Sequence, residues 1–255
     1  MFESYIQKRL KERPILLMTH IVIGYPTLKT SLELIDTMVA SGVDLMELQI
    51  PFSEPIADGP VILKANQKAL AAGTLVADCF DTAATAVKHH SIPFLFMTYY
   101  NILHRFGVDA FVARMADTGL SGAIVPDLPP EEGQAYQAAM DTHQMAPVYI
   151  YAPTTPDERM RYIARHGRGM IYCVARKGVT GQETQFSEDL GVYLDRCRVA
   201  TPLPLALGFG VKDAADVAFL TGKVDIAVVG TQCLRILEEK GVAAVGDFIR
   251  QLRAE

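Results

Sequence analysis

The chain has 255 residues, of which 50% are hydrophobic and 21% are charged, and its formal net charge is −5. This balance is ordinary for a globular protein with a full core, and it argues against a nucleic-acid-binding surface or a basic membrane patch. The first residues, MFESYIQKRLKERP, lack the apolar core of a secretory signal, and no apolar run reaches the length of a membrane span. The four cysteines are far apart and form no CxxC pair. We therefore expect a soluble cytoplasmic protein.

Short apolar or β-branched runs recur along the chain, each followed by a stretch with helical periodicity. After a polar N-terminal segment of helical pattern, the predicted strands are 15–23, 43–50, 92–100, 122–126, 146–151, 169–175, 203–208 and 225–230. Continuous apolar strands that alternate with helices indicate a parallel sheet covered by those helices. Eight such units predict a (β/α)8 barrel. An open doubly wound sheet is the alternative, but the GxGxxG fingerprint that usually follows its first strand is missing.

No low-complexity linker divides the sequence. We therefore predict one domain over residues 1–255, with an N-terminal helix and active-site loops after the second and sixth strands. In such a barrel the functional residues gather at the carboxyl ends of the strands.

The stretch ELQIPFSEPIADGP, residues 47–60, places two acids around the second predicted strand. Strand alternation puts Glu47 and Gln49 on one inward face, with Gln49 nearer the mouth, and Asp58 follows in a loop above them. Taken singly, Glu47 also fits a buried acid satisfied by its neighbours, and Asp58 fits an ordinary turn residue. Together, at the end of one βα unit, they indicate acid–base chemistry by two carboxylates in differently solvated surroundings.

Each of the last three predicted strands is followed by a turn that contains glycine. These turns are ARKGVTGQET (175–184), GFGVKDAAD (208–216) and VGTQCLRIL (229–237). Glycines there leave backbone N–H groups open to a ligand, and helix N-termini add favourable partial charge for an anion. Each turn alone is also compatible with a plain tight connection, but three on consecutive units predict a phosphate site.

Several motifs resemble those of the tryptophan synthase alpha chain family. ELQIPFSEPIADGP is similar to that family's signature, and the resemblance extends in order and spacing over nearly the whole chain. The further matching segments are IGYPTLKTS (23–31), MTYYN (97–101), IVPDLPPEE (124–132), GVTG (178–181), GFGV (208–211) and GT (230–231).

The resemblance implies a (β/α)8 barrel lyase that cleaves indole-3-glycerol phosphate to indole and glyceraldehyde 3-phosphate, with neither metal nor organic cofactor. It makes Glu47 the acid–base residue, Asp58 the partner of the indole N–H, and Tyr172 a neighbour of the catalytic acid. Thr180 matches a loop threonine that closes over the site. The remaining implied contacts are a phosphate cradle of Gly181, Phe209, Gly210, Gly230 and Thr231, and an indole wall of Ile62, Tyr99, Ile124 and Ile150.

The family also implies a protein partner. Its members pair with a PLP-dependent beta chain in an alpha2beta2 heterotetramer and pass indole to that chain through a tunnel. The contact surface would include the segments PFSEP (51–55) and PDLPPEE (126–132).

Two residues depart from the family pattern. Gln49 stands where the family has Gly, and His20 stands where it usually has an apolar residue lining the indole. Both are expected to face inward from neighbouring strands, so we hypothesise that His20 and Gln49 touch or share a water. They are either a compensated pair that leaves function intact or a change that retunes activity, substrate or dependence on the partner.

Two alternatives to an alpha-subunit lyase stay open. One is a divergent stand-alone lyase acting on a related phosphorylated substrate. The other is a weakly active barrel that mainly activates a beta chain, although the intact set of Glu47, Asp58, Tyr172 and Thr180 argues against it.

Overall fold

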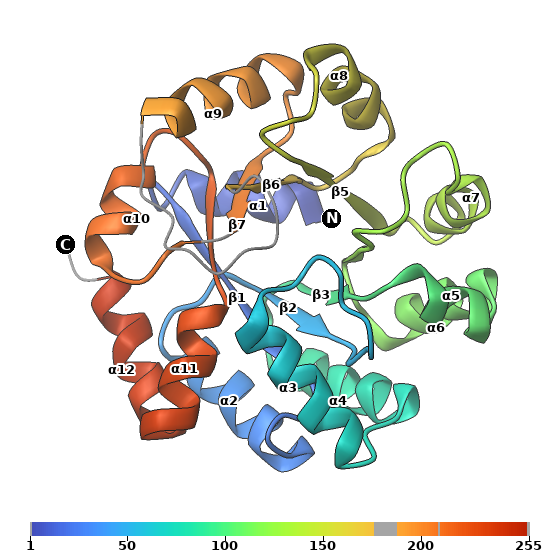
Figure 1. The fold of residues 1–255 in the computed structure, drawn as a ribbon, viewed down its shortest axis with the longest axis vertical. Coiled ribbons are helices and arrows are strands. Elements are labelled where there is room, and N and C mark those ends of the chain that lie inside the picture. Colours follow the sequence, from blue (N-terminus) through green and yellow to red (C-terminus); the bar gives the residue numbers. More distant parts are fainter. Residues whose placement is uncertain (1, 176–187, 209, 254–255) are drawn as a thin grey trace.

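A computed structural model describes residues 2–175, 188–208 and 210–253. Eight parallel strands close into a barrel in which neighbours in sequence are neighbours in space and β8 pairs with β1 (Figure 1). The strands are β1 (Leu16–Val22), β2 (Leu45–Gln49), β3 (Phe94–Met97), β4 (Gly122–Ile124), β5 (Ala146–Tyr151), β6 (Ile171–Val174), β7 (Leu205–Gly208) and β8 (Ile226–Val229). The predicted (β/α)8 barrel is confirmed, and seven of the eight strands are slightly shorter than predicted.

The helices of the described ranges enclose the barrel, and most of them form a ring around these strands (Figure 1). They are α1 (Phe2–Leu10), α2 (Leu28–Ala40), α3 (Pro60–Ala71), α4 (Val76–His89), α5 (Tyr100–Phe106), α6 (Val108–Thr118), α7 (Gln134–Thr142), α8 (Asp157–His166), α9 (Glu188–Ala200), α10 (Ala214–Leu220), α11 (Thr231–Lys240) and α12 (Val242–Arg253). The connections after β2, β3 and β8 each contain two helices. Gly73, Gly107 and Gly241 lie at these three breaks with positive φ angles of 85°, 95° and 82°, a conformation that ends a right-handed helix.

The barrel interior is a packed apolar core. Strand alternation divides the side chains into an inner cluster, which includes Met18 and Leu45, and an outer cluster beneath the helices, which includes Ile21 and Leu48. The register pairs Met18 with Leu45, and two residues further on it pairs His20 with Glu47. The apolar interior therefore changes to a polar one toward the carboxyl ends of β1 and β2.

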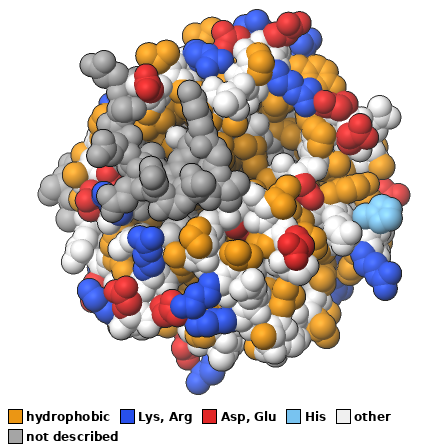
Figure 2. Space-filling view, in the orientation of Figure 1, with side chains coloured by type: hydrophobic (Ala, Val, Ile, Leu, Met, Phe, Trp, Pro, Cys, Tyr) orange, Lys and Arg blue, Asp and Glu red, His pale blue; other side chains and the backbone are white. Residues whose placement is uncertain are grey.

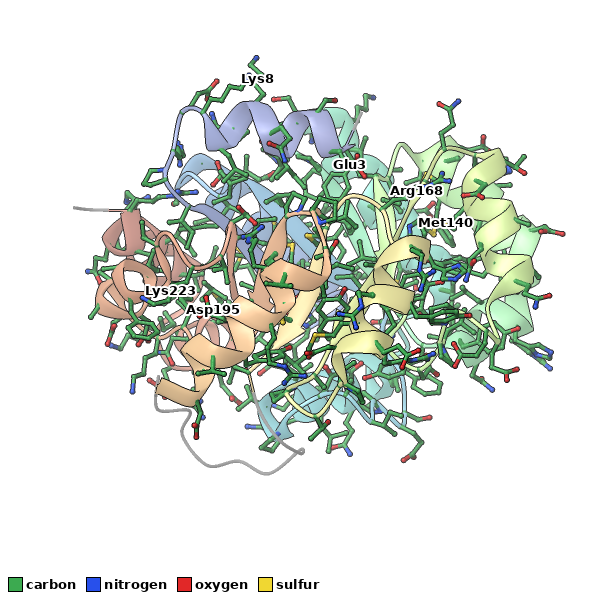
Figure 3. The ribbon with its side chains drawn as sticks, turned by 90° about the horizontal axis from the view of Figure 1, so that it is seen from above. Glu3, Lys8, Met140, Arg168, Asp195 and Lys223 are labelled. Atoms are coloured by element: carbon green, nitrogen blue, oxygen red, sulfur yellow. The ribbon has the colours of Figure 1, made fainter. Side chains whose placement is uncertain are left out.

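Helix α1 closes the opposite end of the barrel. Its residues Phe2 and Ile6 join the inner cluster, and the backbone N–H of Gly169 donates to Glu3 Oε1 at 2.9 Å. In Figure 3 this helix lies across one end of the molecule, with Lys8 pointing away from the barrel. The carboxyl ends of the strands are thus left as the end at which a ligand can enter.

No single helix of the described ranges is long and apolar enough to cross a membrane. Helices α3 and α4 meet that requirement only as a pair, and the pair is bent by 109°.

Candidate functional site

Neighbouring strands β1 and β2 place three polar side chains inside the barrel. His20 and Glu47 are register partners with 4% and 3% of their surfaces exposed, and Gln49 is fully buried. His20 Nδ1 lies 3.0 Å from Glu47 Oε1. Burial of polar groups is costly unless they are hydrogen-bonded, so this contact offsets part of the cost of burying two ionisable groups.

Glu47 has a second partner from the other side of the barrel. The hydroxyl of Tyr172, on β6, donates to the same Oε1 atom at 3.4 Å. Space for the tyrosine ring is provided by Gly208 on β7, where a Cβ atom would lie 2.3 Å from the ring and its hydroxyl. The position of Tyr172 beside Glu47 therefore depends on a glycine in the next strand.

Asp58 lies in the loop between β2 and α3 and folds back over the strand ends. Gln49 Nε2 donates to Asp58 Oδ2 at 2.7 Å, and the hydroxyl of Tyr99 donates to the same atom at 3.1 Å. The backbone N–H of Ala57 donates to the Tyr99 hydroxyl at 3.1 Å, and the Tyr99 ring stacks on Phe52. The loop is therefore fastened so that Asp58 faces the same space as Glu47.

The surroundings of these groups shift their proton affinities. Burial opposes protonation of His20, but the hydrogen bond with Glu47 and the charges of Glu47 and Asp58 outweigh it, so the pKa of His20 is raised. Burial raises the pKa of Asp58, and the charge of His20 offsets this only in part. Burial and the charge of Glu47 raise the pKa of Tyr172 well above its usual value. These surroundings therefore favour the protonated forms of His20, Asp58 and Tyr172.

A cavity of about 210 Å³ opens at this end of the barrel and brings most of the predicted site residues together. His20, Glu47, Asp58 and Tyr172 are among the polar side chains that line it. The predicted wall residues Ile62, Ile124 and Ile150 also line it, joined by Met97 and Val228. On the face shown in Figure 2, apolar side chains predominate around the centre with a few acids among them. One side of the cavity is thus suited to a flat apolar ring.

The other side of the cavity is suited to an anion. Gly210, Gly230 and Thr231 of the predicted cradle line it, and α11 begins at Thr231 with Gly230 as its N-cap. Lys212 and Arg235 also line the cavity and were missed by the sequence analysis. Arg235 follows Thr231 by four residues, a spacing that puts both side chains on one helix face and could have identified it.

Some predicted residues lie elsewhere. Tyr99 and Gln49 are fully buried and do not line the cavity; they support Asp58 from behind. His20 hydrogen-bonds Glu47, while His20 Nε2 and Gln49 Oε1 are both buried without a partner in the described part of the chain, so a contact between His20 and Gln49 stays a hypothesis. Thr180, Gly181 and Phe209 lie outside the described residues. Among the residues that the structure describes, no three His, Cys, Asp or Glu side chains are grouped so that they could hold a metal ion.

Comparison with known proteins agrees with this geometry. A family model described as tryptophan synthase alpha chain matches residues 6–252. The tryptophan synthase alpha chain of Syntrophotalea carbinolica is 65% identical over 253 residues, 99% of this chain and all of that one. That of Desulforapulum autotrophicum is 60% identical over 252 residues, with the same coverage of both chains.

Solved structures give the same result. A chain of Mycobacterium tuberculosis tryptophan synthase aligns with a TM-score of 0.91 at 30% identity, over 98% of this chain and 96% of that chain. The tryptophan synthase alpha subunit of Legionella pneumophila aligns with a TM-score of 0.89 at 28% identity, over 99% of this chain and 96% of that chain.

Proposed function

The chain belongs to the tryptophan synthase alpha chain family, and from that membership we propose how its cavity performs the family's reaction. The family is a lyase of tryptophan biosynthesis that cleaves indole-3-glycerol phosphate to indole and glyceraldehyde 3-phosphate. In our proposal the indole lies against Ile62, Ile124 and Ile150, and the phosphate lies at the N-terminus of α11. Lys212 and Arg235 supply positive charge near that helix end.

Breaking the bond between the indole ring and the glycerol chain needs a proton at the ring carbon. Glu47 donates that proton, which places positive charge on the indole nitrogen, and Asp58 stabilises this charge by accepting a hydrogen bond from the N–H. Glu47 then accepts the proton of the hydroxyl on the adjacent side-chain carbon as the C–C bond breaks. The electron pair of that bond returns to the ring, and indole and an aldehyde are released.

One observation supports this assignment above the others. Glu47 and Asp58 line a single cavity, but their hydrogen-bond partners differ: Glu47 meets the ionisable His20, whereas Asp58 meets the uncharged donors Gln49 and Tyr99. Two carboxyl groups held in different surroundings can keep different protonation states at one pH, as this division of labour requires.

We further propose that the chain works with a PLP-dependent beta chain in an alpha2beta2 assembly. The segment 51–55 and the residue after it form a candidate contact, because Ile56 has 67% of its surface exposed. Leu75 is 65% exposed and lines a groove together with Phe52. An apolar groove with exposed apolar side chains next to the site loop supports a protein contact there.

The test is indole release from indole-3-glycerol phosphate by the full chain, with and without a beta chain. We expect indole and glyceraldehyde 3-phosphate in equal amounts, and faster release with the partner. Equally fast release alone would indicate the stand-alone lyase, and binding to the beta chain with no indole formed would indicate an activator. No release under either condition, with the fold intact, would refute the proposed reaction.

A matched pair of variants tests the phosphate end. Thr231→Ser keeps the hydroxyl and is expected to keep KM. Thr231→Val removes the hydroxyl at equal size, and we expect KM to rise about tenfold because a hydrogen bond to a charged group is lost.

A further inference from the structure

The contact between His20 and Glu47 has a chemical consequence for the acid that starts the reaction. Both side chains are almost fully buried, and both contacts that the described residues make to the Glu47 carboxyl fall on Oε1. An ionised carboxylate only accepts hydrogen bonds. The 3.0 Å contact therefore holds a proton, carried either by His20 Nδ1 or by Glu47 itself.

The second ring nitrogen of His20 is also constrained. Gln49 Nε2 is committed to the acceptor Asp58 Oδ2, so Gln49 Oε1 is left as a buried acceptor without a partner in the described ranges. His20 Nε2 is likewise buried and unpartnered. An N–H at His20 Nε2 is the complementary donor, reaching Gln49 Oε1 directly or through one water. With a proton at Nε2, Nδ1 is free to give or take the proton that lies between His20 and Glu47.

We propose that His20 is a positioning residue for Glu47. The two side chains share one proton between Nδ1 and Oε1, and Gln49 fixes the His20 ring so that the edge carrying this proton faces Glu47. The proposal rests on the proposed function, because it assigns a role within that reaction. In this role His20 supports the acid Glu47 and does not serve mainly as a wall for the indole. It also explains why the polar His20 and Gln49 occupy adjacent strands inside the barrel.

The proton count of the pair is conserved through the reaction. The pair begins with one proton, either as imidazolium and carboxylate or as imidazole and carboxylic acid. Transfer to the ring carbon leaves neutral imidazole and carboxylate, and uptake of the substrate hydroxyl proton restores the starting state. The pair is inactive with no proton, because nothing can then be donated to the ring carbon.

Other ionisable groups also face the His20–Glu47 pair. Tyr172 approaches from β6, and Asp58 approaches from the loop after β2, where Tyr99 donates a hydrogen bond to it. On the β8 side a Cβ at Gly230 would lie 3.0 Å from His20 Cβ, so the glycine backbone packs against the histidine there. Lys212 and Arg235 line the same cavity. The pKa of His20 is raised by Glu47 and Asp58, which supports retention of the shared proton at neutral pH.

The test compares the pH dependence of kcat/KM for wild type, His20→Asn and Thr19→Val. Asn keeps an N–H donor near the place of Nδ1 but cannot carry the proton. We expect the alkaline limb of wild type above about pH 6.5, and in His20→Asn we expect it lower by about one pH unit or more. The loss in His20→Asn should fall on kcat more than on KM. Thr19 is adjacent on β1, and its buried hydroxyl has no partner among the described residues, so Thr19→Val controls for changes to the strand.

A titration of His20 by NMR in the wild-type chain gives a reading that does not depend on activity. We expect its pKa above the ordinary value and lower in Glu47→Gln. An unmoved alkaline limb in His20→Asn, or a His20 pKa that is the same in wild type and Glu47→Gln, would overturn the shared proton. Wild type that releases no indole would instead refute the proposed reaction, so the two failures are distinguishable.

Discussion

Glu47 and Asp58 are buried acids from one βα unit, but the side chains around them assign them different tasks. Glu47 touches His20, a group that can carry a proton, whereas Asp58 accepts hydrogen bonds from the uncharged Gln49 and Tyr99. Burial raises the pKa of Asp58 and the charge of His20 counters this only partly. Keeping Asp58 ionised therefore lowers the stability of the fold, but it provides the carboxylate that the reaction needs.

Asp58→Asn is expected to gain stability and lose activity. A raised pKa means that the folded chain holds the proton of Asp58 more tightly than the unfolded chain, so the wild type loses stability as pH rises through that pKa. Asn keeps an acceptor for both donors and has no such cost. In urea unfolding we expect the variant to be more stable than wild type at pH 7, with the gap closing below about pH 4.

The same variant is expected to lower kcat/KM by about 10²-fold, because no anion then faces the indole nitrogen. Asp117→Asn, at an exposed position on α6, is the control and should change neither quantity. A gap in stability that widens toward low pH would contradict the account.

At the scale of elements, strand β7 determines where a side chain of β6 lies. Gly208 leaves room for the Tyr172 ring, and a methyl group there would meet it at 2.3 Å. Tyr172 donates to Glu47, so a change in one strand reaches a catalytic group through its neighbour.

Gly208→Ala is expected to displace Tyr172, to cost about 1–3 kcal/mol of unfolding free energy and to reduce kcat/KM about tenfold. Gly191→Ala is the matched control. No heavy atom of the described residues lies within 4 Å of a Cβ at Gly191 in α9, so that change should stabilise the chain by about 0.5–1 kcal/mol. Equal effects of the two substitutions on activity would contradict the role of Gly208.

The sequence predicted the elements better than the contacts between them. Continuous apolar runs separated by helical patterns identified all eight strands, and alternation correctly placed Glu47 and Gln49 inside. Alternation also turned His20 inward, but it could not choose between Glu47 and Gln49 as its partner. That choice depends on the register of β1 against β2, which the barrel as a whole determines.

Two further features were beyond the sequence pattern. The second helices after β2, β3 and β8 follow glycines that are also compatible with a short turn inside one connection. Lys212 looks like a surface charge in sequence, and only the fold shows that it lines the cavity; for Arg235 the spacing from Thr231 was the available signal.

At the scale of the whole molecule, the two ends of the barrel have separate roles. At the closed end, the fully buried Asp44 meets arginines from α1 and α12: Arg9 lies 2.8 Å away and Arg253 is in direct contact. The backbone N–H of Leu17 donates to Asp44 at 2.9 Å. These contacts fasten both terminal helices to the barrel, far from the cavity.

Asp44→Asn is expected to lower the free energy of unfolding by about 3 kcal/mol, because the partly buried Arg9 and Arg253 lose their counter-charge, while kcat/KM at 25 °C stays the same. Asp247→Asn is the control. It removes an exposed acid that pairs with Arg250 on α12 and should cost less than about 1 kcal/mol. Loss of activity in Asp44→Asn at full folding would contradict this separation.

The central claim is that Glu47 carries the proton transfers of indole-3-glycerol phosphate cleavage. The most direct measurement pairs calorimetric binding of that substrate with indole release for wild type and Glu47→Gln. Gln keeps the size and an acceptor for Tyr172 but cannot exchange the proton. We expect nearly unchanged affinity and indole release lower by about 10³-fold. Indole release within about tenfold of wild type would contradict the claim.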